Sequence, residues 1–320
     1  MEWFGSFVSA LTRMRSALLA VAALAIVAPR PLGACSICRC GDPTFNALGK
    51  DSYGVESFKL ALDSERFDKE QGSPTTGSES QVEKRMTALA SYGLWNRVTL
   101  FARVPYSIRS LTTSMPSSSA TALHTSGFSD PEIYGQVRLW SSQFSGGLGQ
   151  RSSLSLNLGV KTPWGRNDVK QGGERVDEHG QPGTGATDVF GNLAFLYLLD
   201  KRSAVFVSGG YRHTGQSSFG YRYGASALAN VAYEHKLGQR LDSVIELNFR
   251  HAQQDRVDAA GTLDGDTGGS LVYAPPKLLV SLGRGIVLRA AAQLPVVRGL
   301  NGFQKERAVL NVGLTYLFSR

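Results

Sequence analysis

The sequence predicts an all-β fold, an up-and-down antiparallel transmembrane β-barrel of about twelve strands that follows a cleaved N-terminal signal peptide. Three observations lead to this prediction. From residue 55 onward, apolar and polar residues alternate with a period of two, in segments about ten residues long, which suits a tilted strand that crosses a bilayer. The connections between these segments alternate between short and long. No apolar run of about 18 residues follows the first thirty, so helical spans of the mature chain are excluded.

The first 34 residues have the features of a secretory signal peptide. A basic start with two arginines precedes an apolar run at residues 17–28 that is too short to span a membrane as a helix. We therefore divide the chain into a signal peptide at 1–34, a Cys-containing periplasmic segment at 35–54 and a transmembrane barrel at 55–320. An exported chain does not meet the genome, and no Lys/Arg-rich run accompanies the net charge of +8, so a nucleic-acid partner is excluded.

All three cysteines lie together in the motif CSICRC at residues 35–40. A covalent c-type haem needs histidine directly after the second cysteine of a Cys-x-x-Cys pair, and Arg39 occupies that position. This rules out haem attachment and leaves three interpretations of the motif.

The sequence LGAC that ends at Cys35 resembles a lipobox, which is compatible with acylation of that cysteine. An oxidising periplasm would also form a disulfide between Cys35 and Cys38 or between Cys38 and Cys40. Alternatively, the thiolates of Cys35, Cys38 and Cys40 bind Cu or Zn, and the segment docks a periplasmic redox or metal protein. No other cofactor is predicted.

Twelve segments of the mature chain show the period-two alternation of a strand. They are 55–68, 82–95, 97–109, 130–141, 152–163, 186–199, 202–213, 220–237, 241–254, 270–282, 285–297 and 305–318. In the clearest one, 97–109, Leu100 and Ile108 lie on one face and Arg103 and Arg109 on the other. A soluble sandwich would show the same alternation, so the faces alone do not distinguish the two folds.

The connections favour the membrane barrel. Residues 69–81, 110–129 and 164–185 form long polar connections, whereas Asn96 and residues 200–201 form tight turns. An outer-membrane barrel has an even number of strands, short turns on the side of its termini and long loops outside. We therefore predict periplasmic N- and C-termini in the outer membrane of a Gram-negative bacterium.

Aromatic residues near the strand ends support the same location. Trp95, Trp140, Tyr106, Tyr211 and Tyr316 are typical of interfacial girdles. The last strand ends close to Phe318, and this resembles the aromatic C-terminal signal of outer-membrane barrels, although two residues follow it.

The polar faces supply eleven basic and five acidic side chains to the predicted lumen. The basic ones are Lys59, Arg97, Arg103, Arg109, Arg138, Lys161, Arg212, Arg222, Lys236, Arg250 and Arg289, and the acidic ones are Asp63, Glu65, Glu132, Glu234 and Glu246. A twelve-stranded barrel is narrow, so one interpretation is that these charges pair and fill the interior. The other is an open pore that weakly prefers anions.

The five histidines have no metal-ligand spacing to one another. An outer-membrane phospholipase would also be a twelve-stranded barrel, and it would need histidine and serine near the outer rim. His213 and His251 fall there, with Ser217 and Ser218 close in sequence, but no nucleophile motif accompanies them. We therefore predict that the chain is not an enzyme.

Several motifs carry a resemblance to a known family. They are GFSD at 127–130, LNLGVKTPWG at 156–165, GTGATD at 183–188, Tyr223-Gly224 with Asn230 and Tyr233, and QLPVVRGLNG at 293–302. In this order along the chain they resemble outer-membrane barrels of the transporter-like family that includes putative phenol meta-pathway proteins. The resemblance implies an outer-membrane location and passage of small solutes, hydrophobic ones among them, and supplies no catalytic residues.

The sequence thus predicts a porin-like barrel in outer-membrane lipid that passes small solutes passively, since neither a plug domain nor an energy-coupling motif is recognisable. The alternative is a structural or partner-docking barrel whose N-terminal cysteine segment binds a soft metal or a periplasmic redox protein.

Overall fold

A computed structural model describes residues 57–73, 77–114, 121–143, 150–302 and 304–318. The membrane-crossing strands are β1 (Phe58–Ser73), β2 (Gly77–Trp95), β3 (Val98–Ser114), β4 (Thr121–Phe128), β5 (Glu132–Gln143), β6 (Gln150–Lys161), β9 (Asp188–Leu198), β10 (Ser203–His213), β11 (Ser226–Lys236), β12 (Leu241–Ala252), β13 (Gly269–Ala274), β14 (Pro276–Gly283), β15 (Ile286–Leu300), β16 (Gln304–Glu306) and β17 (Val309–Phe318). The connection after β6 contains the short strands β7 (Lys170–Gln171) and β8 (Glu174–Arg175) and the 3₁₀ helix η1 (Glu178–Gly180).

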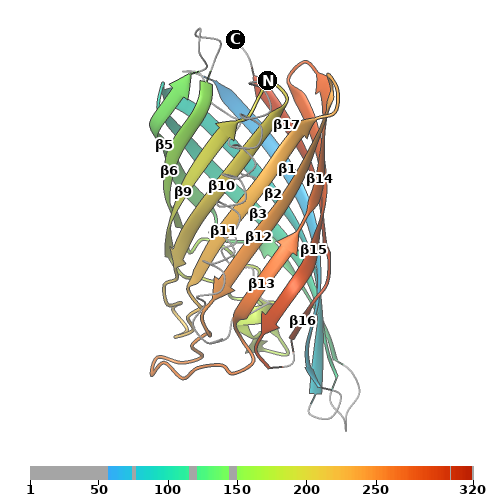
Figure 1. Cartoon of the computed structure of the whole chain (residues 1–320). Coiled ribbons are helices and arrows are strands. Elements are labelled where there is room, and N and C mark those ends of the chain that lie inside the picture. The colour runs from blue at the N-terminus through green and yellow to red at the C-terminus, as the bar shows by residue number, and fades with distance from the viewer. Residues whose placement is uncertain (1–56, 74–76, 115–120, 144–149, 303, 319–320) are drawn as a thin grey trace. The chain divides into compact units, whose positions relative to one another are not determined.

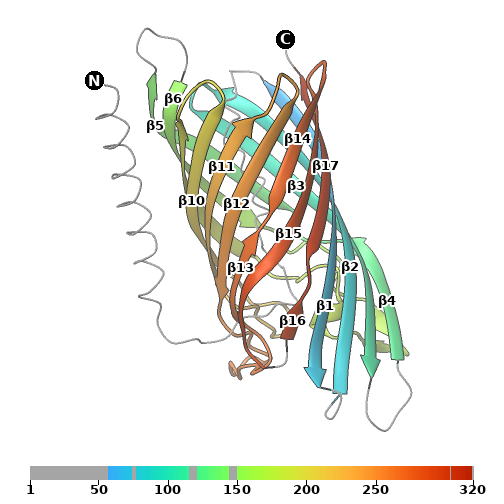
Figure 2. The ribbon, with the colours of Figure 1, turned by 45° about the vertical axis from the view of Figure 1, so that its right-hand side comes forward.

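These strands form one antiparallel sheet that closes on itself through the pairing of β11 with β12 (Figures 1 and 2). Three crossings are interrupted: β4 and β5 both pair with β3, β13 and β14 both pair with β12 and β15, and β16 and β17 both pair with β1. The sheet is therefore a closed barrel of twelve crossings, as predicted. Closure gives each strand two neighbours and so satisfies the backbone polar groups in lipid.

The outer wall of the barrel is apolar. Leu62, Leu314 and Leu288 are neighbours across β1, β17 and β15, and 48%, 48% and 36% of their surfaces are exposed. The alternating polar positions are buried instead; on β3, for example, Ser107 is fully buried while Ile108 is exposed. A soluble sandwich would bury the apolar face, so this pattern excludes it.

The predicted strands are confirmed, most of them within a few residues, but two predicted long loops are wrong in extent. Residues 69–73 and 77–81 pair with each other in β1 and β2, and 110–113 pair with 121–124 of β4. Residues 69–73 and 77–81 are polar on both faces, and 110–113 and 121–124 are mostly polar, so they lack the apolar alternation that marks a strand within the bilayer. Antiparallel backbone hydrogen bonds nevertheless extend the strands beyond it.

The strand predicted at 220–237 starts only at Ser226. Residues 221–225 belong to the preceding connection, where Arg222 and Arg256 exchange backbone hydrogen bonds in an isolated bridge. The tyrosines of this stretch turn toward other connections instead of extending the sheet.

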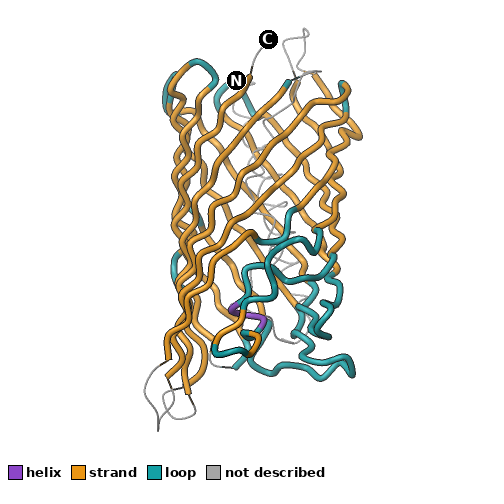
Figure 3. Tube along the Cα trace, turned by 180° about the vertical axis from the view of Figure 1, so that it is seen from behind, coloured by secondary structure: helices purple, strands orange, loops and turns teal. Residues whose placement is uncertain are grey.

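The connections divide between the two ends of the barrel. The turns β2–β3, β9–β10, β11–β12 and β14–β15 lie at one end, which we call the short-turn mouth (Figure 1). Phe58 and Phe318, the outermost residues of β1 and β17, are paired there with ring centroids 5.3 Å apart. Most of the described loop residues lie at the other end, which we call the long-connection end (Figure 3). No helix in the described part of the chain is long and apolar enough to cross a membrane.

Candidate functional site

The connection between β6 and β9 folds into the long-connection end of the barrel (Figure 3). We call residues 162–187 the constriction segment. Near its middle, three main-chain carbonyls accept hydrogen bonds from buried side chains of the barrel wall. Arg109 Nη1 on β3 donates to His179 O at 3.0 Å and to Gln181 O, and Thr125 Oγ1 on β4 donates to Gly180 O at 2.7 Å. The lumen wall thus holds the backbone of the segment.

The opposite side of this turn contacts two other connections. Tyr221 Oη donates to Asp255 Oδ2 at 2.6 Å and lies 3.2 Å from His179 Nε2. His179 Nδ1 in turn lies 2.9 Å from Asp177 Oδ1. The constriction segment is therefore fixed both to the β3–β4 wall and to the connections that precede β11 and β13.

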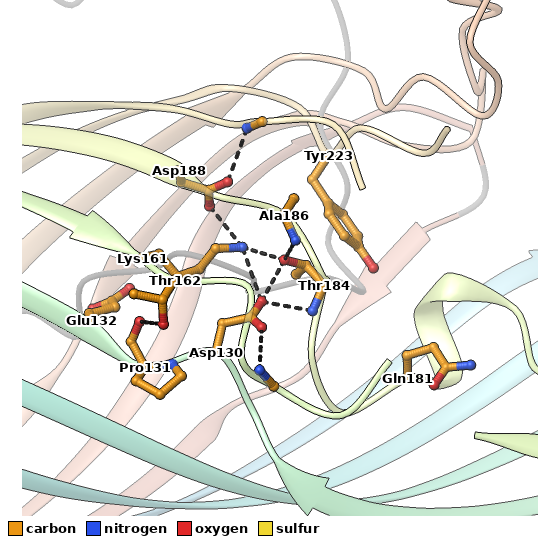
Figure 4. Close-up of polar contacts among 12 residues, drawn as sticks. Asp130, Pro131, Glu132, Lys161, Thr162, Gln181, Thr184, Ala186, Asp188 and Tyr223 are labelled. Atoms are coloured by element: carbon orange, nitrogen blue, oxygen red, sulfur yellow. Dashed lines mark hydrogen bonds and ion pairs between the residues drawn. The ribbon is translucent and has the colours of Figure 1, made fainter. Parts of the chain in front are cut away.

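Asp130 holds the two ends of the segment together (Figure 4). Its Oδ1 accepts a hydrogen bond from Gly165 N at 2.9 Å, and its Oδ2 accepts from Thr184 N at 2.7 Å and Thr184 Oγ1 at 2.5 Å. A Cβ on Gly165 would lie 2.6 Å from the backbone nitrogen of Asp130, and a Cβ on Gly183 would lie 2.6 Å from the carbonyl carbon of Gly165. Only glycine fits at these two positions.

Three of the sequence motifs therefore meet at one place. GFSD supplies Asp130, LNLGVKTPWG supplies Gly165, and GTGATD supplies Gly183 and Thr184. The sequence indicated these motifs only as parts of a family resemblance and did not predict that they meet. The sequence signal for this role is Asp130 at the start of a predicted strand. A carboxylate buried there needs hydrogen-bond donors from elsewhere in the chain.

Buried charges next to Asp130 form a connected network. Lys161 Nζ lies 3.2 Å from Asp130 Oδ2 and 3.0 Å from Asp188 Oδ2. Glu132 accepts from Arg103 Nη1 at 2.6 Å and from Arg212 Nη2 at 2.7 Å. Buried ion pairs of this kind position groups more than they add stability, because desolvation offsets their attraction.

Two further buried pairs lie deeper in the wall. Lys277 Nζ on β14 lies 2.6 Å from Glu246 Oε1 on β12, and Arg289 on β15 pairs with Asp63 on β1. Several of the predicted lumen charges, among them Arg103, Arg212, Arg289, Glu132 and Asp63, thus form ion pairs within the barrel.

The structure places the predicted lumen-lining residues in three groups. Arg103, Arg109, Lys161, Arg212, Arg250 and Arg289 are buried or nearly so on the inward face of the wall. Arg97 and Arg138 lie at the short-turn mouth, where Arg97 is exposed and Arg138 Nη1 lies 3.5 Å from Asn96 O. Arg222 was expected on a strand and lies instead in the connection before β11, where its Nε donates to Thr214 O at 2.9 Å.

The prediction underestimated acidic residues. Among the described residues, the buried Asp, Glu, Lys and Arg side chains comprise ten acids and seven bases. Five of these acids were not assigned to the lumen from sequence: Glu83, Asp130, Asp188, Asp255 and Glu306. Glu83 lies within the predicted strand 82–95, and Asp130, Asp188 and Glu306 lie at or near the starts of predicted strands. Asp255 directly follows the predicted strand 241–254.

The two histidines that the sequence placed near the outer rim, His213 and His251, have partners other than the serines considered with them. His213 Nε2 lies 3.0 Å from Arg222 Nη2, and His251 Nδ1 lies 3.0 Å from Ser270 Oγ, its cross-strand neighbour, so neither pairs with Ser217 or Ser218. The described ranges contain no group of three or more potential metal ligands. The predicted site at Cys35, Cys38 and Cys40 lies outside them.

A closed twelve-stranded barrel with an apolar outer wall and a polar, charged inner wall defines an outer-membrane β-barrel. Comparison with solved structures agrees with this class. An outer-membrane channel from Pseudomonas putida F1 matches with a TM-score of 0.63 and 14% identity over 83% of this chain and 97% of that chain. This likeness shows the fold.

More distant matches are also barrels. The translocator domain of the autotransporter NalP from Neisseria meningitidis has a TM-score of 0.46 at 12% identity, covering 84% of this chain and 91% of that one. The toluene transporter TbuX from Ralstonia pickettii has a TM-score of 0.43 at 7% identity, covering 83% and 90%. No protein-family model and no curated protein matches the sequence.

Proposed function

We propose that this protein is a passive outer-membrane channel for small solutes, narrowed at its long-connection end by the constriction segment. The observation that carries the proposal is the attachment of that segment to the inner wall through Arg109 and Thr125. A barrel that served only as a scaffold would not need a loop held inside its lumen by buried side chains. An infolded loop of this kind sets the size of the passing solute.

Single-channel recording in planar bilayers tests the proposal. The purified full-length mature protein should give small, discrete conductance steps, because the constriction segment leaves a narrow path. Absence of any conductance, in a preparation that shows the heat-modifiable gel mobility of a folded barrel, would contradict it and favour the partner-docking alternative. That alternative rests on Cys35, Cys38 and Cys40, with Cu or Zn or a periplasmic redox protein as partner.

We further propose that the channel weakly prefers anions, with the preference set at the short-turn mouth. The buried charges do not favour anions, since acids outnumber bases among them. The short-turn mouth does, because Lys59, Lys201, Arg202, Lys236 and Arg240 surround its interior. Reversal potentials in a salt gradient should have the sign of an anion-preferring pore, and a cation-preferring pore would contradict this part of the proposal.

A further inference from the structure

The short-turn mouth contains a cavity of about 600 Å³, which we call the mouth cavity. Its volume lies within the range of small-molecule sites in proteins. It is formed by the turns β9–β10 and β11–β12 and by the adjacent ends of β1, β14, β15 and β17. It lies at the opposite end of the barrel from the constriction segment, so it is a separate site.

Charge around the mouth cavity is strongly one-sided. Six basic residues line it and one acid does: Lys59, Lys201, Arg202, Lys236, Arg240 and Arg289, against Asp242. Arg289 is paired with Asp63, but Lys201, Arg202, Lys236 and Arg240 form no ion pair with any described residue. Like charges gathered around one concavity repel one another, and an anion that enters relieves this repulsion.

The inner side of the mouth cavity is apolar. Leu279 and Val287 line it, and Leu279 belongs to a buried cluster of the inner wall against which Val287 packs. The other members of the cluster are Ala194, Leu196, Ala204, Phe206, Ala232 and Val244. Elsewhere the buried face of the strands carries mostly polar and charged side chains. Leu279 and Val287 therefore bring an apolar surface to a cavity whose other lining residues are mostly charged or polar.

We propose that the mouth cavity binds small amphiphilic carboxylates, with the carboxylate at Lys236 and Arg240 and the hydrocarbon part against Leu279 and Val287. The proposal rests on the proposed channel function, since it names a solute class for that channel. A basic rim alone would select inorganic anions, and an apolar wall alone would select neutral hydrocarbons. The two together select a molecule that has an anionic head and an apolar tail.

A titration of the full-length mature protein in nanodiscs of uncharged lipid tests this inference. The probes are hexanoate, hexan-1-ol and acetate, which separate the contribution of the tail from that of the charge. Hexanoate should bind at least about tenfold more tightly than either of the others, because only hexanoate uses both parts of the cavity. Equal affinity for all three probes, or no binding of hexanoate, would overturn the proposal.

Variants locate the site. Lys236→Gln with Arg240→Gln should weaken hexanoate about tenfold and leave hexan-1-ol unchanged. Val287→Thr, which keeps the side-chain shape, should weaken hexanoate and leave acetate unchanged. Arg97→Gln is the matched control, because Arg97 is an exposed base at the same mouth but does not line the cavity. Hexanoate binding that survives the double variant would overturn the assignment.

Two outcomes separate this inference from its alternatives. A protein that conducts but does not bind hexanoate refutes the mouth site alone, whereas one that binds hexanoate but does not conduct refutes the channel and retains the site. The basic mouth could also contact anionic lipid headgroups. To test this, hexanoate is also titrated in nanodiscs that contain phosphatidylglycerol. If the double variant changes the affinity for hexanoate only in those discs, the cavity is a lipid-contact surface and the proposal is wrong.

Discussion

The guanidinium of Arg109 donates a hydrogen bond to the main-chain oxygen of His179 at 3.0 Å, and through it the barrel wall holds a connection that begins more than fifty residues later in the chain. Arg109 also lies 3.4 Å from Glu83, which fixes the orientation of its side chain. The contact between Arg109 and His179 joins the wall to the constriction segment, so it determines how wide the proposed path is.

The first prediction concerns this attachment. In Arg109→Gln, the segment loses charge-assisted hydrogen bonds worth about 1.5–3 kcal/mol each. The ratio of molecules with a detached constriction segment to molecules with an attached one should therefore rise by at least roughly tenfold. This change should appear as larger or more frequent conductance steps. Lys170→Gln, on the exposed strand β7 of the same segment, is the control and should behave as wild type. Unchanged conductance in Arg109→Gln would mean that the segment does not limit the path.

The second prediction is a dependence on pH. Partial desolvation raises the pKa of the Asp177 carboxyl, whose side chain is 62% exposed, but the hydrogen bonds and charge of His179 lower it more, so that the pKa of Asp177 lies below its ordinary value. A lowered pKa stabilises the folded segment above the ordinary value of about 3.9, and this stabilisation is lost as the pH falls through the lowered pKa.

Channel conductance should therefore stay constant from neutral pH to about pH 5 and rise below about pH 4. Asp177→Asn should remove this step, and a series of recordings at graded pH measures it. A step near pH 6.5 that persists in Asp177→Asn would instead identify histidine protonation as the cause.

The third prediction tests a buried ion pair. Lys277→Met leaves the Glu246 carboxylate buried with one weaker partner, Asn248 Nδ2 at 3.3 Å, and should lower the free energy of unfolding by about 3–5 kcal/mol. The double variant Lys277→Met with Glu246→Leu should regain most of that loss, because no unpaired charge remains. Denaturant unfolding in micelles measures both, with Lys305→Met at an exposed position as control. A double variant less stable than the single one would show that the pair contributes net stability.

The fourth prediction concerns orientation in the membrane. Single cysteines at Ala260, in the connection after β12, and at Gln239, in the β11–β12 turn, both occupy exposed positions at opposite ends of the barrel. A membrane-impermeant maleimide applied to intact cells should label Ala260→Cys and spare Gln239→Cys, since the short turns are expected to face the periplasm. Both should react after permeabilisation. The reverse pattern in intact cells would invert the topology.

The fifth prediction concerns the cysteines at 35, 38 and 40. Closely spaced thiols do not remain free in an oxidising compartment, so we expect acylation, a disulfide or a bound soft metal. Intact-protein mass spectrometry with and without reductant distinguishes a diacylglycerol-sized addition, a two-hydrogen deficit and a retained metal. Three thiols that all react with an alkylating reagent before reduction would contradict all three interpretations.

The sequence by itself determined the class of fold and the two faces of the wall. Alternation with period two places Leu100 and Ile108 in lipid and Arg103 and Arg109 inside, because successive side chains of a strand point to opposite sides. The alternation of connection lengths can also be read from the sequence alone. It favoured a membrane barrel over a soluble sandwich, which the alternation of apolar and polar residues could not do. Where polar residues stood on both sides, as in 69–81, the same rule did not detect the strands.

Only the tertiary structure decided which residues meet inside the lumen. Asp130 bonds to Thr184, 54 residues away, and Arg109 bonds to Gln181, 72 residues away. Neither contact leaves a periodic signal in the sequence, because each depends on how a long connection folds back into the barrel. The charge balance was missed for the same reason, since buried acids such as Asp188 and Asp255 stand at strand ends and in connections. Local alternation fixes the direction of a side chain, whereas its partner is fixed by closure of the barrel and the path of its loops.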